Sequence, residues 1–334
     1  MGDSLKGKVA IVTGSGQGIG RGVAIGLARE GSKIVTNNRK PGSTGTAFLT
    51  DDDFKALGPE RTAWYKKGIE GVNGDAEQTA AQIKELGGEA VPCYADISRM
   101  DEAGKLVQTA LDSFGRIDII ANIASGFGIC PVEKMTEEIW DRVTLTKPKG
   151  YYNVIQHALP HMMKQKWGRI INTTSRAFNG DIIKHVEYCA ANAGVVGLTK
   201  ALAIELWPYG ITCNAISPFA MSRASWELQA LTEIENKGGT PIWMYGNAGE
   251  GMLEFTPGPE YVAPMICYLS TEDAANISGS VFNVGANGVG LYSDPEICKS
   301  VTKPAKEPWT VEELKQQLPR SVFAGYRTIA TDYH

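Results

Sequence analysis

The sequence lacks paired cysteines, long apolar runs and a strong net charge, and each absence excludes a class of protein. Its cysteines stand alone at positions 93, 130, 189, 213, 267 and 298, without a C-x-x-C pair. Disulfide frameworks and metal sites are therefore disfavoured, and we expect reduced thiols in a cytoplasmic protein. No apolar run reaches the roughly 20 residues that a membrane-spanning helix needs. A net charge of −4 gives no reason to expect nucleic acid or an anionic membrane as a partner.

Short runs rich in valine and isoleucine alternate with helical stretches along most of the chain. Each run is apolar throughout rather than alternating in polarity, which is typical of parallel strands buried on both faces. Helices between such strands favour right-handed crossovers, so the pattern predicts an α/β fold with a doubly wound, seven-stranded parallel sheet of the Rossmann type. The predicted strands are Val9–Thr13, Lys33–Asn37, Ala90–Tyr94, Ile117–Asn122, Arg169–Thr174, Thr212–Ile216 and Ser280–Val284.

Two segments exceed what such a fold requires. Lys40–Gly74, after the second strand, is rich in Gly, Thr, Asp and Lys, and we expect a long loop there that is functional or mobile. The tail after Gly290 carries several prolines and a predicted short helix at Thr310–Gln317, capped by Thr310. We therefore expect one domain over residues 1–290 and a C-terminal extension over residues 291–334 that packs on the domain or on a partner subunit.

A glycine-rich segment, T-G-S-G-Q-G-I-G at positions 13–20, links the first strand to the first helix. Glycines let the backbone turn tightly and approach a pyrophosphate, whose charge meets the free N–H groups at the start of the helix. Four alternate glycines exceed what a tight turn alone needs, so the segment predicts a dinucleotide site. The expected contacts are Gly14, Gln17, Gly18, Ile19 and Gly20.

Further residues stand where one oxidoreductase family contacts its cofactor. They are Asp96 and Ile97 at the adenine ring, Asn122 and Ala124 in a turn that the family writes N-N-A-G, and Pro218 and Ser222 at the nicotinamide carboxamide. With the glycine segment, they make the chain resemble a short-chain dehydrogenase/reductase from about Lys6 to Gly288. The long segment after the second strand, the segment S-P-F-A-M-S-R and the tail are also similar to the (3R)-hydroxyacyl-CoA dehydrogenase domain of peroxisomal multifunctional enzymes.

The end of the second predicted strand bears on which nicotinamide cofactor is used. An acidic residue there would accept hydrogen bonds from the ribose 2′-hydroxyl and repel a 2′-phosphate. This chain has the neutral Asn38, followed by Arg39 and Lys40. A neutral amide beside two cations favours NADP(H), since arginine can bind a phosphate through two hydrogen bonds. The two cations could instead be solvated loop charges, and NAD stays possible.

The resemblance assigns proton transfer to Ser175 and Tyr188, whose spacing of thirteen residues is that of the family. In the family the tyrosine phenol exchanges a proton with the alcohol or ketone oxygen, and the serine hydroxyl orients that oxygen. A phenol with an ordinary pKa near 10 is a poor base at neutral pH, so a nearby cation is needed to favour the phenolate.

The lysine that supplies this cation in the family is missing. It should stand four residues after Tyr188, but Asn192 occupies that place. A family asparagine in the preceding helix aligns with Lys147, when W-D-R-V at 140–143 and Lys149-Gly150 are used as guides. Lysine and asparagine are thus exchanged. Pro148, directly after Lys147, predicts a kink in that helix.

Several interpretations of the exchange stay open. Lys147 could reach the Tyr188–Asn192 pair from the opposite side and restore the positive charge, giving an oxidoreductase. The site could bind cofactor without redox turnover, as a regulatory or pseudo-enzyme subunit. Tyr188 and Ser175 could also perform non-redox acid/base work, as in a hydratase or lyase. Finally, Lys147 could be one more exposed lysine of the T-K-P-K run.

The substrate region of the family follows the sixth strand and is rich in aromatic and methionine residues here. Such side chains favour an apolar, cyclic or acyl-CoA alcohol or ketone, although core or subunit contacts would need the same residue types. They are Phe219, Met221, Trp226, Trp243, Met244, Tyr245, Met252 and Phe255. The resemblance also implies a homodimer or homotetramer formed through the helices that carry Lys147 and Tyr188.

Overall fold

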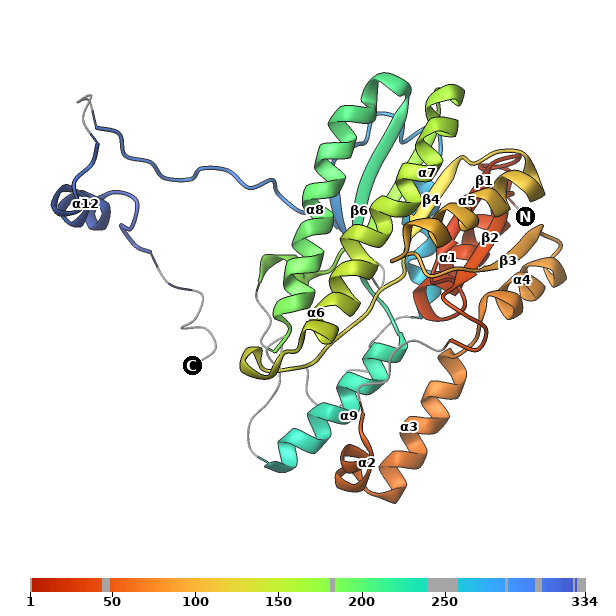
Figure 1. The fold of residues 1–334 in the computed structure, drawn as a ribbon, viewed down its shortest axis with the longest axis horizontal. Coiled ribbons are helices and arrows are strands. Elements are labelled where there is room, and N and C mark those ends of the chain that lie inside the picture. Colours follow the sequence, from red (N-terminus) through yellow and green to blue (C-terminus); the bar gives the residue numbers. More distant parts are fainter. Residues whose placement is uncertain are drawn as a thin grey trace. The chain divides into compact units, whose positions relative to one another are not determined.

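The computed structural model describes residues 2–43, 49–180, 184–238, 258–285, 288–303, 308–326 and 328. The chain forms two compact units, Met1–Leu291 and Tyr292–His334. The first unit holds the sheet and its covering helices (Figure 1). In the second, the predicted helix is confirmed as α12 (Val311–Gln317), where Thr310 and Glu313 form a capping box.

The first unit is an α/β fold with a doubly wound sheet, as predicted. The order of the strands is β3-β2-β1-β4-β5-β6-β7-β8, and all neighbours are parallel except β7 and β8. The prediction of seven strands was therefore one short. The strands are β1 (Val9–Thr13), β2 (Lys33–Asn38), β3 (Ala90–Tyr94), β4 (Ile119–Asn122), β5 (Gly168–Thr173), β6 (Ile211–Phe219), β7 (Val281–Gly285) and β8 (Gly288–Leu291).

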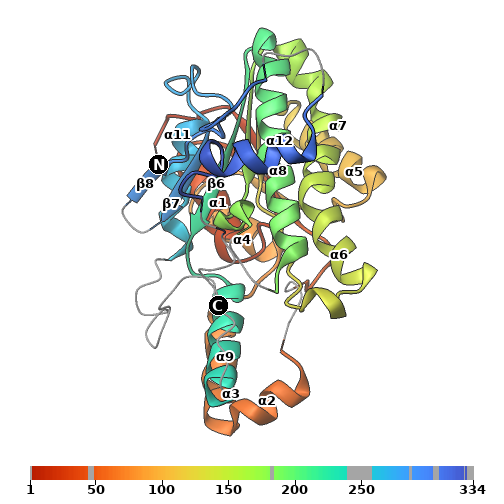
Figure 2. The same ribbon diagram turned by 90° about the vertical axis from the view of Figure 1, so that its left-hand side faces the viewer.

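Helices cover both faces of this sheet and bury two separate apolar cores. One core packs β1, β4 and β5 against the face shared by α5 (Met100–Phe114), α7 (Gly150–Gln165) and α8 (Val186–Leu206). The other packs the opposite face against α1 (Gly18–Arg29), α4 (Ala76–Glu85) and α11 (Ala263–Leu269). Figure 2 shows the two layers on either side of the strands. Apolar residues on both faces are what parallel strands require.

The segment Lys40–Gly74 is not the long loop that was predicted. After residues 44–48, which lie outside the described part, it forms α2 (Asp51–Leu57) and α3 (Pro59–Val72). Both pack against α9 (Arg223–Gly238), and Figures 1 and 2 show the three helices together at one end of the sheet. Two local signals explain the helices: a capping box between Thr50 and Asp53, and a proline in the first turn of α3.

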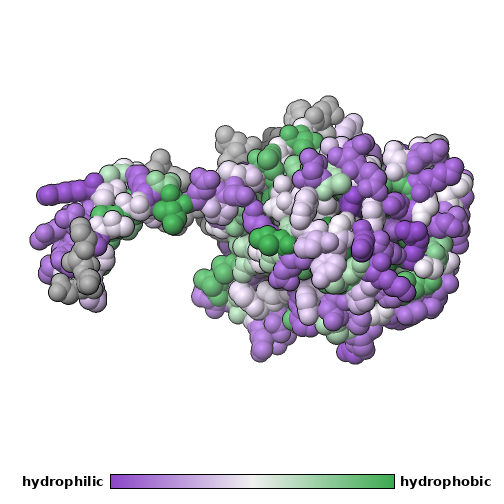
Figure 3. Space-filling view, turned by 90° about the horizontal axis from the view of Figure 1, so that it is seen from above, coloured by the Kyte–Doolittle hydropathy of each residue, from purple (hydrophilic) through white to green (hydrophobic). Residues whose placement is uncertain are grey.

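One helical stretch of the described residues, Val186–Tyr209, is long and apolar enough to cross a membrane by length and composition alone. A core helix passes the same test, and here this stretch covers the sheet. The face drawn in Figure 3 is mostly polar, with hydrophobic side chains in small separate groups. All six cysteines are free thiols. No group of ligand side chains suited to a metal ion is found among the described residues.

Candidate active site

A cavity of about 350 Å³ opens where the parallel strands end. Ligands of doubly wound sheets bind at this edge, where the strand order reverses between β1 and β4. Most of the residues that line the cavity lie at or after the ends of β1, β2, β3, β4, β5 and β6, so distant parts of the chain meet there.

The glycine segment forms a cradle that side chains would fill. A Cβ atom on Gly14, whose φ is +65°, would stand 2.8 Å from the Ala124 Cα atom. One on Gly20 would stand 2.2 Å from the Gly14 carbonyl oxygen, and one on Gly16 would stand 1.9 Å from Asn38 Oδ1. The backbone can therefore approach a bound pyrophosphate closely. The five predicted contacts, Gly14, Gln17, Gly18, Ile19 and Gly20, all line the cavity.

Four residues predicted to contact the adenosine, Asn38, Arg39, Asp96 and Ile97, line the cavity. Asn38 Nδ2 donates to the Ser43 carbonyl at 3.0 Å, while its buried Oδ1 has no hydrogen-bond partner among the described residues. Arg39 is exposed at the rim. The last residue of β2 is therefore a neutral amide with an unpaired acceptor oxygen, and the residue after it is an exposed arginine. An acidic residue at the end of β2 would disfavour a 2′-phosphate.

Asn122 is the one predicted cofactor residue that does not line the cavity. It is fully buried at the end of β4, and its amide donates to Asn172 Oδ1 at 3.0 Å. Asn172 in turn donates to Thr199 Oγ1. This chain of hydrogen bonds ties β4 to β5 and α8 behind the cavity wall. Ala124, Pro218 and Ser222 do line the cavity.

Ser175 and Tyr188, the residues predicted to transfer the proton, both line the cavity. Ser175 follows β5 and begins a short 3-10 turn, where its Oγ accepts from the Ala177 N–H at 3.3 Å. Tyr188 lies in the first turn of α8, and its ring is stacked on Phe127 with the ring centres 4.4 Å apart. The two hydroxyls are thus carried by adjacent elements, the end of one strand and the start of the next helix.

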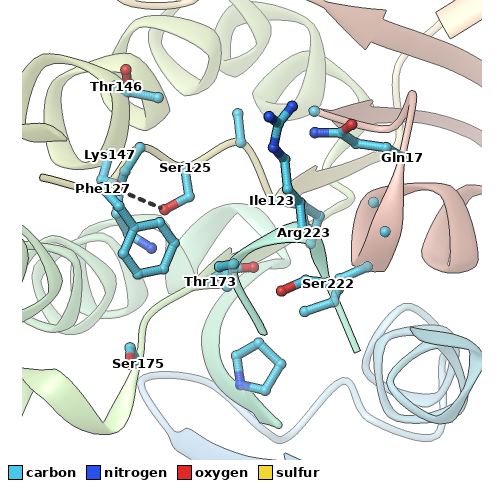
Figure 4. A pocket seen from close by; sticks show the side chains of 18 of the residues that line it. Gln17, Ile123, Ser125, Phe127, Thr146, Lys147, Thr173, Ser175, Ser222 and Arg223 are labelled. Carbon is cyan, nitrogen blue, oxygen red and sulfur yellow. Dashed lines mark hydrogen bonds between the residues drawn. The ribbon is translucent and has the colours of Figure 1, made fainter. Parts of the chain in front are cut away.

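Lys147 lines the same cavity, in a π-helical turn at Leu145–Lys149 between α6 (Glu137–Thr144) and α7. The sequence predicted a kink before Pro148, and the π turn is the form that the irregularity takes. The Lys147 side chain is completely buried. Its Nζ has no hydrogen-bond partner among the described residues and stands 5.5 Å from the centre of the Tyr188 ring. Figure 4 shows it beside Thr146, Ser125 and Phe127, on one side of the pocket.

Burial lowers the pKa of Lys147 to about 7. The cause is the loss of water around the ammonium group, which no carboxylate among the described residues offsets. A second phenol, Tyr151, has its ring centre 5.8 Å from the Nζ atom. Burial raises the pKa of Tyr151 well above its usual value, and its hydroxyl donates to the Ala124 carbonyl at 2.8 Å. Of the two phenols beside Lys147, Tyr188 is the one that lines the cavity.

Asn192 lies one helical turn after Tyr188 and behind it. Its Nδ2 donates to the Tyr188 carbonyl at 2.8 Å, inside α8, and its Oδ1 has no partner among the described residues. Asn192 does not line the cavity. The two exchanged residues therefore differ in exposure to a ligand: Lys147 faces the cavity, and Asn192 faces the helix.

The predicted substrate residues are distributed unevenly. Phe219 lines the cavity and is half exposed. Trp226 packs on Trp64 of α3, with ring centres 4.9 Å apart. Met221 does not line the cavity. Trp243, Met244, Tyr245, Met252 and Phe255 lie outside the described residues.

Several charged residues that line the cavity were missed from the sequence. Arg142, Arg223 and Glu227 belong to α6 and α9. The spacing of four between Arg223 and Glu227 predicts a helical ion pair, and Arg223 Nε donates to Glu227 Oε1 at 2.7 Å. That signal could have been read, but it does not reveal that both residues face the cavity.

Comparisons with known proteins agree with this geometry. A family model described as short chain dehydrogenase matches residues 68–230. The chain is 30% identical over 285 residues to a putative short-chain type dehydrogenase/reductase of Mycobacterium tuberculosis, covering 85% of this chain and 84% of that one. A crystal structure of a short chain dehydrogenase from Mycobacterium avium superposes with a TM-score of 0.71 at 26% identity, covering 96% of each chain.

The chain belongs to the short-chain dehydrogenase/reductase family, whose members are oxidoreductases that generally bind NAD(P). It is also 31% identical over 310 residues to the peroxisomal multifunctional enzyme type 2 of Mus musculus. That match covers 92% of this chain and 36% of the mouse protein, so the chain spans about a third of that relative's length.

Proposed function

We propose that the protein is an NADP(H)-dependent oxidoreductase that interconverts a secondary alcohol and a ketone, with Lys147 in place of the family's relay lysine. One observation carries the proposal: a fully buried ammonium group without a hydrogen-bond partner among the described residues lies 5.5 Å from the Tyr188 ring. Such a group is costly to bury, and a functional role beside a reactive phenol accounts for its retention.

The proposed chemistry divides between the cofactor and the side chains of the pocket. When bound, the nicotinamide supplies or accepts the hydride. Ser175 orients the substrate oxygen by a hydrogen bond, and Tyr188 gives that oxygen a proton in reduction or takes one in oxidation. Both side chains line the cavity, as the division requires.

Lys147 makes the phenol more acidic. A positive charge within a few ångströms favours the phenolate of Tyr188, and low local polarity strengthens the effect. Because burial lowers the pKa of Lys147 to about 7, the lysine and the tyrosine can exchange one proton between them near neutral pH. Asn192 does not supply charge in this arrangement; it bonds to the α8 backbone.

The preference for NADP(H) rests on Asn38 and Arg39. The residues that would hold the adenosine ribose offer an amide and an exposed guanidinium, which suits a 2′-phosphate. NAD is the second candidate, because the guanidinium lies at the exposed rim rather than inside the pocket.

For the substrate we propose an apolar, cyclic or acyl-CoA carbonyl compound. Phe219 and Phe127 give the reaction side an apolar wall. A relative named hydroxynaphthalene reductase-like protein Arp2, from Metarhizium majus, is 28% identical over 284 residues and supports a ring-containing substrate. The resemblance to the (3R)-hydroxyacyl-CoA dehydrogenase domain of peroxisomal multifunctional enzymes supports an acyl-CoA. We also propose a cytoplasmic homodimer or homotetramer, from the lack of C-x-x-C pairs and from family likeness.

The test is turnover by the purified protein with NADPH or NADH and a panel of cyclic ketones and 3-oxoacyl-CoA thioesters, followed by the absorbance of the reduced nicotinamide. Lys147→Ala should lower kcat by roughly 100- to 10,000-fold, the usual contribution of acid/base catalysis. Lys149→Ala is the matched control, because it removes an exposed lysine from the same π turn.

Each other outcome contradicts the proposal in a distinct way. Full activity of Lys147→Ala would show that the relay does not use this lysine. Tight cofactor binding by the wild-type protein without turnover of any substrate would favour a binding protein. Product formation with no change in cofactor redox state would favour a hydratase or lyase.

A further inference from the structure

The α2–α3 hairpin is the part of the first unit that the proposed chemistry does not use. It packs against α9 and buries an apolar cluster of its own, which includes Leu57, Tyr65, Ile69 and Ala230. A Cβ on Gly68 would stand 2.4 Å from the Trp226 ring, so the two helices are in close contact. The hairpin is therefore built onto the helix that carries two charged residues of the cavity.

A buried polar chain runs through this contact. Tyr65 is 4% exposed, and its hydroxyl donates to Glu227 Oε1 at 3.1 Å. Glu227 is completely buried and accepts from Arg223 Nε at 2.7 Å on the same oxygen. Burial and the charge of Glu227 raise the pKa of Tyr65 to about 12, so the phenol stays a hydrogen-bond donor at physiological pH. Tyr65 itself does not line the cavity, whereas Glu227 and Arg223 do.

Arg223 lines the cavity next to the glycine cradle. The residue before it, Ser222, lies 3.8 Å from the position that a Cβ on Gly18 would take. Figure 4 shows Arg223 on the side of the pocket that carries Gln17 and Ser222, away from Lys147. A guanidinium on this side of the pocket is close to the helix start whose backbone N–H groups a diphosphate would meet.

The cradle itself has no cation to offer. Positions 14–20 contain no basic residue. The next residue, Arg21, donates from Nη2 to the carbonyls of Gly16 at 2.9 Å and Asn73 at 2.6 Å, and it does not line the cavity. Its guanidinium is thus used to tie the end of α3 to the glycine segment. A diphosphate in the cradle would carry two negative charges, and the segment at positions 14–20 would meet them with backbone N–H groups alone.

We propose that Arg223 binds the phosphate oxygens of the dinucleotide from beside the glycine cradle, and that the α2–α3 hairpin orients it through Tyr65 and Glu227. Arg223 is then a binding residue, and Tyr65 is a positioning residue that acts through Glu227. This inference rests on the dinucleotide pocket of the proposed function, but not on the Lys147 relay. An anionic group of the substrate, such as a phosphate of an acyl-CoA, offers the same chemistry, and the experiment separates the two sources.

The first experiment measures cofactor affinity without substrate, by the fluorescence of bound NADPH and by calorimetry with ADP-ribose, which keeps the diphosphate and lacks the nicotinamide. Arg223→Ala should raise both dissociation constants by roughly 10- to 100-fold, and Arg223→Lys by less, because a charged hydrogen bond is worth about 1.5–3 kcal/mol. Unchanged affinities for both ligands would overturn the inference. A rise confined to the KM of a 3-oxoacyl-CoA would also overturn it and assign Arg223 to the substrate.

The second experiment tests positioning. Tyr65→Phe should raise the dissociation constant of ADP-ribose by about threefold in the wild-type background and have no effect in the Arg223→Ala background. Glu233→Gln is the matched control, because Glu233 pairs with Arg61 between the same two helices and lies outside the Tyr65 chain. If Tyr65→Phe changed the dissociation constant of ADP-ribose equally in both backgrounds, Tyr65 would have only a packing role, and that half of the inference would be overturned. An equal loss of affinity in Glu233→Gln would lead to the same conclusion.

Failure of this inference and failure of the proposed function are distinguishable. If the wild-type protein binds no dinucleotide at all, the proposed function and this inference both fall. If it binds NADPH and ADP-ribose and Arg223→Ala binds them equally well, only the role of Arg223 is lost.

Discussion

The two sides of one pocket differ in how closely they keep the family arrangement. On the cofactor side, the glycine cradle has the family's spacing, and its close approaches leave no room for a Cβ at Gly14, Gly16 or Gly20. On the reaction side, Asn192 occupies the place where the family has a lysine, and Lys147 lies beside Tyr188 with its Nζ 5.5 Å from the ring centre.

The difference reflects what each side must provide. Phosphate binding by the backbone needs a particular path of the main chain, and very few side chains permit it. Proton transfer needs a charge near a phenol, and a charge can come from any neighbouring element. Lys147 is carried by the π turn before α7, which packs against the helix that carries Tyr188.

The largest effect on cofactor affinity is expected from the glycine cradle. Gly20→Ala would place a Cβ 2.2 Å from the Gly14 carbonyl oxygen, so the cradle must open. We expect the dissociation constant of NADPH to rise roughly 100-fold, the upper end of an overpacking cost of about 1–3 kcal/mol. Fluorescence titration measures it. Gly197→Ala is the control, because a Cβ there meets no atom within 4 Å, and equal losses in both variants would contradict a rigid cradle.

On the reaction side, we expect the buried amine of Lys147 to lower the free energy of unfolding of the wild-type protein. Lys147→Met replaces a buried, unpaired amine by an apolar side chain of similar length, so we expect the free energy of unfolding to rise by roughly 1–4 kcal/mol at pH 6. Because the pKa of Lys147 falls from 10.5, the ordinary value of a solvated lysine, to about 7 in the folded chain, the unfolded chain binds the extra proton between these two values. The wild-type protein should therefore gain stability as pH rises from 7 toward 10.5. Urea unfolding at several pH values measures both effects, and a less stable Lys147→Met variant would contradict the unpaired state of this amine.

Cofactor preference is the next largest effect. Asn38→Asp adds a carboxylate where the 2′-phosphate of NADPH is expected, so it should shift the ratio of kcat/KM values from NADPH toward NADH by about tenfold, or about 1.4 kcal/mol. Arg39→Ala should lower the affinity for NADPH and leave the affinity for NADH unchanged. A wild-type protein that already prefers NADH would overturn the assignment of NADP(H).

The smallest effect is a pH dependence. Reduction needs the protonated phenol with a charged Lys147, so its kcat should fall by about threefold between about pH 6.5 and pH 7.5, as a pKa of about 7 requires. Oxidation, which needs the phenolate, should rise over the same interval. Both inflections should vanish in Lys147→Met. A flat profile in the wild-type protein would remove Lys147 from the rate-determining proton transfer.

The sheet and the place of Ser175 and Tyr188 at the cavity could be predicted from the sequence because their signals are local. Buried parallel strands are uninterrupted apolar runs, and the spacing of Ser175 and Tyr188 reflects one strand and one helix start. β8 was missed because its sequence, G-V-G-L, is exposed and half glycine. The hairpin after β2 was missed because its composition resembles a loop, although a capping box and Pro59 mark both helices.

The polar chain behind Arg223 could not be predicted from the sequence. Tyr65 and Glu227 are 162 positions apart, and nothing in either segment indicates that the other will pack on it. The burial of Lys147 was equally out of reach, because a T-K-P-K run looks like a solvated surface. The Lys147 side chain is excluded from solvent only because α6, the π turn and α8 pack together.

The most direct test of the account is to restore the family arrangement. We would measure kcat at saturating cofactor for Lys147→Asn, Asn192→Lys and the double variant. The account predicts a loss of roughly 1,000-fold for Lys147→Asn alone, within the range of acid/base catalysis, and recovery to within about tenfold of wild type in the double variant. Full activity of Lys147→Asn would contradict the claim that this lysine is the cation that serves Tyr188.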